Sequence, residues 1–320
     1  MKALYFDGKK YTYKPNFPEP VTRDDEMLIQ VIKSGICNTD LEIGKGYMQF
    51  VGVPGHEFVG RVTAGTRKDL IGKRVVGEIN IPCGVCDYCV NNGEPRHCPE
   101  RQVLGILNHQ GTFAAYITLP AQNLHPVPDT ISDEAAVFVE PLAAALRIQE
   151  QMVFEPSDHV AVIGDGKLGI LIAAVLSLRG MKVCLIGRHP ERAGLPILNN
   201  VQFISETEVS KGFKFQVVVD ASGTGEGFKL AFNLVKPCGT VILKSTLAGV
   251  YQSSLNIAVI NEIRIVGSRC GPFMPALQML ADRKIDPRCL IHSEYPIEDG
   301  EKALKVAATP GVLKVLLKIL

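Results

Sequence analysis

The sequence predicts an α/β protein in which a doubly wound parallel sheet follows an irregular, mainly β domain. From residue 158 onward, short apolar strands alternate with helical stretches, as in a parallel sheet with helices on both faces. Before residue 130, Gly and Pro are frequent and the apolar runs are short and β-branched, which favours antiparallel β structure. We therefore expect a first domain over 1–141, to which 269–320 returns, and a dinucleotide-binding domain over 142–268.

The elements can be followed in order along the chain. In the first domain, 27–32 and 72–77 resemble strands, and a helix is expected over 132–146. Strands of the buried, parallel type follow at 159–163, 182–186, 202–204, 216–219, 240–243 and 263–266. This is the number of strands that a doubly wound dinucleotide fold requires. The tail adds a helical stretch near 299–308 and an apolar strand at 312–317.

Composition and charge exclude several classes of function. The 320 residues include 34 Lys and Arg against 33 Asp and Glu, a net charge of +1, so no basic surface for nucleic acid is expected. The longest apolar stretch, 168–178, is too short to span a bilayer, and the N-terminus lacks the apolar core of a signal peptide. We expect a cytoplasmic protein that binds neither nucleic acid nor membrane.

A glycine-rich turn lies between the first parallel strand and the helix after it. The turn Gly164-Asp165-Gly166-Lys167-Leu168-Gly169 has the pattern G-x-G-x-x-G. The first glycine permits a tight turn, the second lets the backbone approach a pyrophosphate, and the third lets helix and strand pack closely. The amides of Lys167 and Leu168 would lie at a helix N-terminus, which favours an anion. We therefore expect a dinucleotide here, with a plain glycine turn as the alternative.

The end of the second parallel strand bears on the choice of cofactor. NAD-binding folds usually carry an acid about 20 residues after the glycines, where it binds the ribose hydroxyls. Arg188 stands at that place, with Arg192 nearby, and a guanidinium matches a 2′-phosphate. We expect NADP to be preferred, with NAD as the alternative because arginine also stacks on adenine. Ser222, Ser245 and Thr246 follow later strands, where they either contact the cofactor or cap turns.

Four of the nine cysteines fall in one short segment. Cys83, Cys86, Cys89 and Cys98 are separated by two, two and eight residues, and four thiolates can close tetrahedrally on one zinc ion. Such a site has no open coordination position, so it organises a loop and performs no chemistry. We expect a structural zinc here. An iron–sulfur cluster, unmetallated thiols, or His97 in place of Cys98 are the alternatives.

Two loops complete an ordered set of motifs, Gly35-Ile36-Cys37-Asn38-Thr39-Asp40 and Pro54-Gly55-His56-Glu57-Phe58-Val59-Gly60. Together with the four-cysteine segment and the glycine-rich turn, they resemble the zinc-dependent medium-chain alcohol dehydrogenases. The matching order runs over nearly the whole chain. The resemblance implies a GroES-like catalytic domain, a Rossmann domain, and a homodimer or homotetramer.

By this resemblance, Cys37 and His56 are ligands of a second, catalytic zinc ion. The third ligand in many members is a cysteine, and Glu140, before Pro-Leu-Ala, takes that place here, as in the polyol-dehydrogenase branch. Glu57 would be a transient fourth ligand that exchanges with water, or else a hydrogen-bonded carboxylate beside the site. Zn²⁺ with one thiolate, one carboxylate and a neutral imidazole has no net charge, so it would remain a competent Lewis acid.

Three residues close to Cys37 would handle protons. By the resemblance, Thr39 accepts the alcohol proton, and Asp40 accepts a hydrogen bond from His56 that sets its tautomer. Local bonding within a turn is the alternative for both residues. Many members carry a histidine five residues after the first zinc cysteine, where this chain has Glu42. Proton exit would use Glu42 or bulk water.

These motifs lead to three hypotheses of function. The first is a zinc-dependent oxidoreductase that transfers hydride between a secondary alcohol, of a polyol or sugar-related compound, and NADP or NAD. The second is a nucleotide-binding regulatory or scaffold protein without turnover, and the third is a zinc-free enone or quinone reductase. The complete set of zinc ligands favours the first, because a protein without this chemistry needs no open zinc site.

Overall fold

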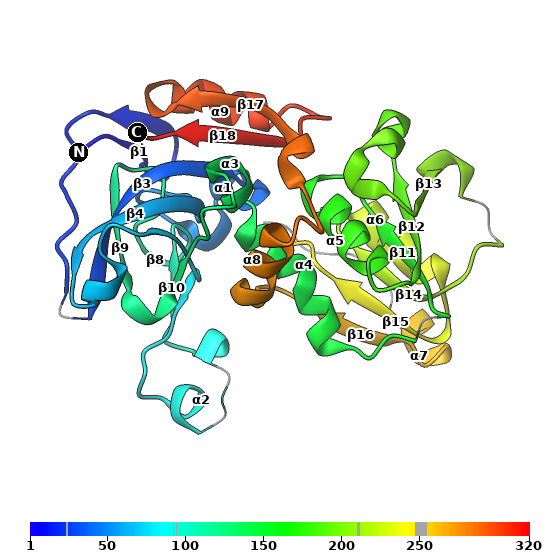
Figure 1. The fold of residues 1–320 in the computed structure, drawn as a ribbon. Helices are drawn as coiled ribbons and strands as arrows, with labels where there is room; N and C mark the ends of the chain where they lie inside the picture. Colours follow the sequence, from blue (N-terminus) through cyan, green and yellow to red (C-terminus); the bar gives the residue numbers. More distant parts are fainter. Residues whose placement is uncertain (24, 92, 94, 156, 210–211, 247–254) are drawn as a thin grey trace. The chain divides into compact units, whose positions relative to one another are not determined.

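Two units make up the chain in the computed structural model, which describes residues 1–320 except 24, 92, 94, 156, 210–211 and 247–254 (Figure 1). The β unit consists of Met1–Glu140, Phe273–Lys284 and Ile291–Leu320, and the α/β unit of Pro141–Pro272 and Ile285–Leu290. The predicted fold class, a parallel sheet with helices plus a mainly β domain, is confirmed. None of the described helices is long and apolar enough to cross a membrane.

A seven-stranded sheet forms the centre of the β unit. Its strands lie in the order β10-β5-β4-β3-β18-β17, and β9 pairs with β3 outside this path. The bounds are β3 Glu26–Ile36, β4 Glu57–Gly65, β5 Arg74–Gly77, β9 Tyr116–Pro120, β10 Leu124–Pro126, β17 Ile291–Pro296 and β18 Lys314–Lys318. The C-terminal β18 runs antiparallel beside β3, so early and late parts of the chain share one sheet (Figure 1). The strands predicted at 27–32, 72–77 and 312–317 fall in β3, β5 and β18.

Smaller elements complete the β unit. The additional strands are β1 Ala3–Phe6, β2 Tyr11–Lys14, β6 Asn80–Ile81, β7 Gln102–Leu104 and β8 Asn108–His109. The helices are α1 Asn38–Ile43, α2 Asp87–Val90, α3 Asp133–Ala136, α8 Phe273–Ala281 and α9 Gly300–Ala307. Helix α9, which was predicted near 299–308, packs against β17 and β18. It buries Ala303, Leu304 and Ala307, the i, i+1 and i+4 spacing of one helix face.

The helix predicted over 132–146 is divided into two. Ser132 caps the N-terminus of α3 as expected, because its hydroxyl accepts a hydrogen bond from the amide of Ala135. Helix α3 then ends at Ala136, and α4 (Val139–Gln151) begins after a break. The two residues between the helices are buried against distant segments, since Val137 lies beside Gly35 and the ring of Phe138 faces Lys314. The single-helix prediction was therefore wrong at Val137 and Phe138.

A six-stranded parallel sheet forms the centre of the α/β unit. Its order is β13-β12-β11-β14-β15-β16, which is the doubly wound order. The bounds are β11 His159–Ile163, β12 Lys182–Gly187, β13 Val201–Ser205, β14 Phe215–Asp220, β15 Val235–Leu243 and β16 Arg264–Gly267. The helices other than α4 are α5 Lys167–Ser177, α6 Gly225–Leu234 and α7 Asn256–Ile260. Each predicted parallel strand therefore has its counterpart in the sheet.

The glycine-rich turn connects β11 to α5 through very close backbone packing. Gly164 has φ of 102°, a left-handed conformation that side chains rarely adopt. A Cβ atom at Gly169 would overlap the carbonyl oxygen of Gly164. A Cβ atom at Gly166, by contrast, would meet no atom within 4 Å. The third glycine is therefore required by packing, and the second is not required by the fold.

Substitution of the two glycines should have unequal effects on stability. Gly169→Ala should lower the free energy of unfolding by about 1–3 kcal/mol or more, because helix and strand must separate to admit the methyl group. Gly166→Ala should change it by less than about 0.5 kcal/mol, since its φ of −75° suits alanine and the space is open. Urea unfolding without cofactor measures both values. Equal stability of the two variants would contradict the packing argument.

Candidate functional site

Strands β3 and β4 bring three predicted zinc ligands together in the β unit. Cys37 directly follows β3, His56 directly precedes β4, and Glu57 pairs in register with Gly35. The ligand atoms of Cys37, His56 and Glu57 all lie within 4.8 Å of one another. Thiol, imidazole and carboxylate are the donors that zinc binds in proteins, so the group fits the implied metal.

A single buried carboxylate connects the two ligand loops. Asp40 is fully buried, and it accepts hydrogen bonds from the amide of Cys37 at 2.8 Å and from the amide of Gly55 at 3.1 Å. Its Oδ1 also lies 3.5 Å from Nδ1 of His56, an electrostatic contact without hydrogen-bond geometry. Because Nδ1 faces Asp40, Nε2 is the ring nitrogen left for a metal.

The electrostatics of this group favour a cation. Burial lowers the pKa of His56, but the negative charges of Asp40 and Cys37 outweigh burial and raise the pKa well above its ordinary value. The same negative charges would attract a metal cation to the ring.

The predicted proton-handling residues lie on α1, next to Cys37. The Cys37 thiol donates a hydrogen bond to the hydroxyl of Thr39, with 3.7 Å between sulfur and oxygen. Glu42 is buried, and its Oε1 lies 2.8 Å from Nζ of Lys45. Thr39 is thus adjacent to the candidate ligands, and Glu42 holds an ion pair.

Glu57 has a buried partner that sequence reasoning missed. The ammonium of Lys314 forms an ion pair with Oε2 of Glu57, and both side chains are at most 2% exposed. Nζ of Lys314 also lies 5.6 Å from the centre of the Phe138 ring. The available signal was a lysine at the start of a C-terminal strand, followed by three apolar residues. The predicted third ligand, Glu140, is the second residue of α4 and is outside the group of close ligand atoms found among the described residues.

The four-cysteine segment forms a separate cluster around α2. Sulfur–sulfur distances are 3.5 Å for Cys86–Cys89, 3.6 Å for Cys86–Cys98 and 3.9 Å for Cys83–Cys89. Zn–S bonds of about 2.3 Å place tetrahedral ligands about 3.8 Å apart, so the cluster has the size of a four-thiolate zinc site. Backbone amides of Val85 and Cys86 lower the pKa of Cys83 to about 6, which favours the thiolate. Within the described residues the group includes Cys98 and not His97.

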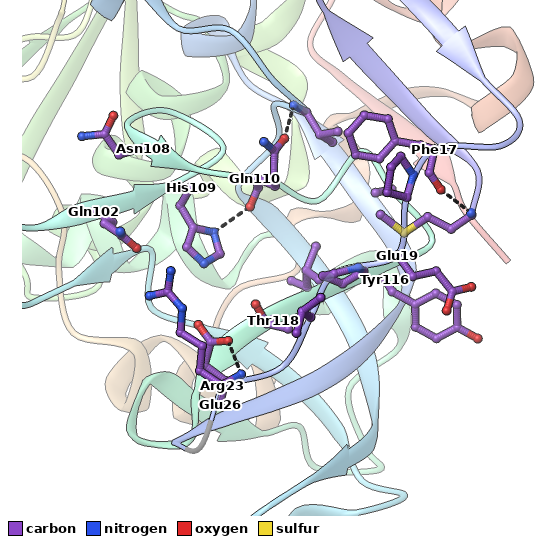
Figure 2. A pocket seen from close by; sticks show the side chains of 17 residues that line it. Phe17, Glu19, Arg23, Glu26, Gln102, Asn108, His109, Gln110, Tyr116 and Thr118 are labelled. Atoms are coloured by element: carbon purple, nitrogen blue, oxygen red, sulfur yellow. Dashed lines mark hydrogen bonds between the residues drawn. The ribbon is translucent and has the colours of Figure 1, made fainter.

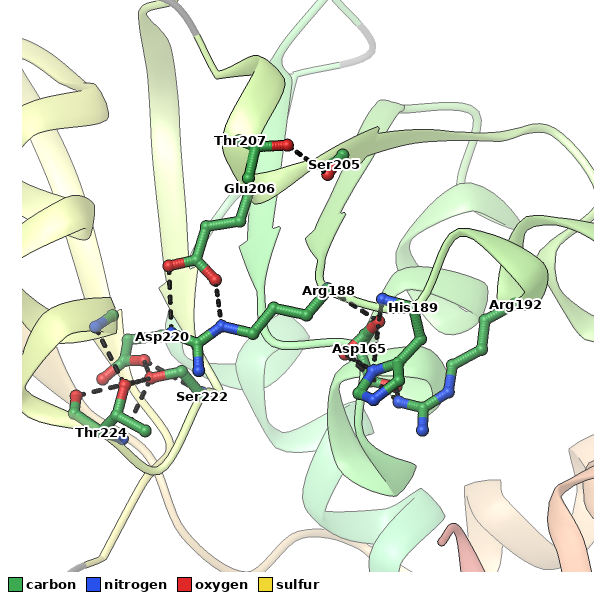
Figure 3. Close-up of polar contacts among 11 residues, drawn as sticks. Asp165, Arg188, His189, Arg192, Ser205, Glu206, Thr207, Asp220, Ser222 and Thr224 are labelled. Atoms are coloured by element: carbon green, nitrogen blue, oxygen red, sulfur yellow. Dashed lines mark hydrogen bonds and ion pairs between the residues drawn. The ribbon is translucent and has the colours of Figure 1, made fainter. Parts of the chain in front are cut away.

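In the α/β unit, one carboxylate attaches the glycine-rich turn to the end of β12 (Figure 3). Asp165 accepts hydrogen bonds from the amides of Arg188 at 3.1 Å and His189 at 2.8 Å. The guanidinium of Arg192 is buried and lies 3.2 Å from Oδ1 of Asp165. Arg188 instead is exposed and bonds both carboxylate oxygens of Glu206, one of them at 3.1 Å from Nη2. The two arginines predicted to bind the cofactor therefore have different environments.

The predicted hydroxyl contacts lie at the ends of β14 and β15. Ser222 donates a hydrogen bond to Asp220 at 2.6 Å (Figure 3), and Ser245 accepts one from the amide of Gly223 at 2.9 Å. Thr246 is exposed. Ser222 and Ser245 thus stabilise the turn after β14, which is the turn-capping alternative, at the edge where a dinucleotide is expected.

A pocket of about 310 Å³ opens elsewhere in the β unit (Figure 2). Polar groups from separate segments line it, among them Arg23, Glu26, His109, Gln110 and Tyr116. None of the candidate zinc ligands is among its lining residues. We therefore do not assign the pocket to the candidate zinc site.

This chain is similar to known proteins over most of its length. Residues 23–129 match the alcohol dehydrogenase GroES-like domain. Sorbitol dehydrogenase of Halalkalibacterium halodurans is 28% identical, over 94% of this chain and 93% of the relative. Starvation-sensing protein RspB of Escherichia coli is 30% identical, over 90% of this chain and 89% of the relative.

Solved structures agree with the sequence comparison. The alcohol dehydrogenase RspB from Escherichia coli CFT073, crystallised with NADH, has a TM-score of 0.87 and 25% identity, with 100% of this chain and 99% of that chain covered. The fold is therefore shared over the full length of both chains. This chain belongs to the zinc-dependent medium-chain dehydrogenase/reductase family and is an oxidoreductase of the alcohol-dehydrogenase type.

Proposed function

We propose that this enzyme oxidises a secondary hydroxyl of a polyol or sugar-related compound, reduces the ketone in the reverse direction, and exchanges hydride with NADP or NAD. The convergence of Cys37, His56 and Glu57 within 4.8 Å supports a functional zinc site in the β unit, which we take as the catalytic domain. The similarity to a sorbitol dehydrogenase over most of both chains supports a polyol substrate. A screen of polyols and simple secondary alcohols with both cofactors, followed by nicotinamide absorbance, tests the proposal. A protein without turnover would favour the scaffold hypothesis.

The proposed ligands of the catalytic zinc are Cys37, His56 and Glu140, with Glu57 or water in the fourth position. A zinc ion held there would polarise the substrate hydroxyl as a Lewis acid. Asp40 contributes by facing Nδ1 of His56 and by holding the Cys37 amide, which fixes both ligands in place. We also propose that the protein assembles as a homodimer or homotetramer, as the family resemblance implies.

Thr39 is proposed to accept the proton of the substrate hydroxyl. Its hydroxyl currently accepts a hydrogen bond from the Cys37 thiol. As a zinc ligand, Cys37 is a thiolate and can no longer donate, so the Thr39 oxygen becomes available to the alcohol. Proton exit through Glu42 would require its carboxylate to exchange protons while paired with Lys45.

Arg188 is proposed to recognise the 2′-phosphate of NADP after it leaves Glu206. The pair is exposed, with 60% of the Arg188 side chain accessible, so breaking it has a small free-energy cost. Arg192 supports the turn through Asp165 and does not contribute a free guanidinium. Glu206 would therefore compete with the 2′-phosphate of NADP for Arg188. The binding of NAD, which lacks this phosphate, would not be weakened by Glu206.

The cofactor proposal predicts opposite effects of two substitutions. Arg188→Ala should weaken NADP binding by about ten- to a hundredfold, because charge-assisted bonds to phosphate contribute roughly 1.5–3 kcal/mol. Glu206→Gln should strengthen NADP binding, since it removes the competing carboxylate. NAD affinity should change little in both variants. Fluorescence titration of both cofactors checks this, and an equal loss for NAD and NADP in Arg188→Ala would exclude phosphate recognition by Arg188.

The two proposed zinc ions should differ in lability. The four-thiolate site is closed, whereas the site at Cys37 and His56 has an exchangeable position, so a chelator should remove the latter zinc first. Activity should fall together with the first zinc lost and return when zinc is added. Metal analysis during dialysis measures the order. An active preparation with one zinc or none per chain would contradict the two-site proposal.

Glu140 should be required for the labile zinc. Glu140→Ala removes an anionic ligand, so zinc affinity should fall by at least about ten- to a hundredfold, the size of losses from residues beside a metal site. Glu140→Cys restores the charge and should retain zinc with altered activity. Cofactor binding should persist in both variants. A folded Glu140→Ala protein with full zinc content and normal turnover would show that another residue is the third ligand.

A further inference from the structure

We propose that Lys314 is a positioning residue that holds Glu57 away from the catalytic zinc, so that the fourth coordination position remains available to the substrate. The role rests on the proposed zinc site at Cys37, His56 and Glu140. It concerns a residue with no motif of its own, 257 positions from its partner in the sequence.

The ion pair is built into the sheet that carries the ligands. Lys314 begins β18, which pairs with β3 so that Val315 lies opposite Ile36. Glu57 begins β4 on the other side of β3, opposite Gly35. A Cβ atom at Gly35 would overlap Oε2 of Glu57, so the glycine leaves the space that the carboxylate occupies. The Glu57 side chain therefore passes over Gly35 and meets the ammonium of Lys314.

Burial makes this pairing strong. Lys314 and Glu57 are 1% and 2% exposed at their side chains, so neither charge is solvated by bulk water. An unpaired charge at this depth costs several kcal/mol, and removing one partner of a buried pair is strongly destabilising. The ring of Phe138, 5.6 Å from Nζ, adds a favourable contact for the cation but offers no charge to Glu57.

The charges of the proposed zinc site and of the Glu57–Lys314 pair indicate how this pair affects zinc coordination. Zn²⁺ with the Cys37 thiolate, the Glu140 carboxylate and neutral His56 has no net charge, and the pair of Glu57 with Lys314 is also neutral. The carboxylate of Glu57 lies within 4.8 Å of the ligand atoms of Cys37 and His56. Without Lys314, the metal would be the available counter-charge for this carboxylate. Glu57 would then occupy the position that a substrate hydroxyl needs.

A double-mutant cycle on zinc affinity tests the role. Affinity of the labile site is measured by competition with a chromophoric chelator, in the full-length protein with the four-cysteine site loaded. Lys314→Met should bind zinc about ten- to a hundredfold more tightly and turn over more slowly, because Glu57 becomes a ligand. Glu57→Gln should bind zinc more weakly, since the Lys314 ammonium then repels the metal. The variant with both substitutions is neutral and should have nearly the wild-type affinity.

The controls distinguish this role from a structural one. Lys318→Met, on the same strand but exposed, should leave zinc affinity unchanged. If the ion pair is purely structural, each single substitution should lower the thermal unfolding midpoint without shifting the zinc affinities of the two variants in opposite directions. That result would overturn the proposal. If Lys314→Met fails to fold, Glu57→Gln must still bind zinc more weakly than the double variant, and equal affinities would also overturn it. If the wild type binds a labile zinc ion and the variants bind zinc with the same affinity, only the role of Lys314 is refuted. If the wild type binds no labile zinc ion, the proposed function is refuted as well.

Discussion

The register of β3 against β4 and β18 is the constraint on which the candidate site depends. Opposite the last residues of β3, β4 begins with Glu57 and β18 begins with Lys314, and Cys37 follows β3 directly. Side chains alternate between the two faces of a strand, so a slip of one residue would turn each of these groups to the opposite face. Backbone hydrogen bonds between these strands therefore determine whether thiol, imidazole, carboxylate and ammonium can meet.

The two proposed metal sites differ in how the chain builds them. The cluster around α2 uses four cysteines from one segment, so short turns and backbone amides bring its sulfur atoms to 3.5–3.9 Å. The site at Cys37 and His56 uses residues from separate strands and loops, which only the folded sheet brings together. A local cluster can form with its metal, whereas a dispersed site requires the sheet first. This difference agrees with a structural role for the former and a reactive role for the latter.

In the α/β unit, the glycine-rich turn is supported by a buried carboxylate, that of Asp165. Asp165 is an ordinary position of the glycine motif, yet it holds the backbone after β12 and the buried guanidinium of Arg192 (Figure 3). A Cβ atom at Gly187 would overlap its carboxylate, so that glycine is needed to admit it. The turn is therefore preorganised, and Arg188 is left at the surface with Glu206 as its partner.

Local sequence patterns were sufficient for the fold class, the parallel strands and the four-cysteine cluster, because each depends on spacing between neighbouring residues. The family and the ligand set of Cys37, His56, Glu57 and Glu140 came from resemblance, since no local rule connects separate loops, and the structure brings the first three of these residues together. Three features depended on tertiary structure: the break at Val137 and Phe138, the burial of Arg192, and the ion pair of Glu57 with Lys314. Each results from packing between segments that are distant in sequence, and a charged side chain carries no local sign of the partner that will neutralise it in the folded core.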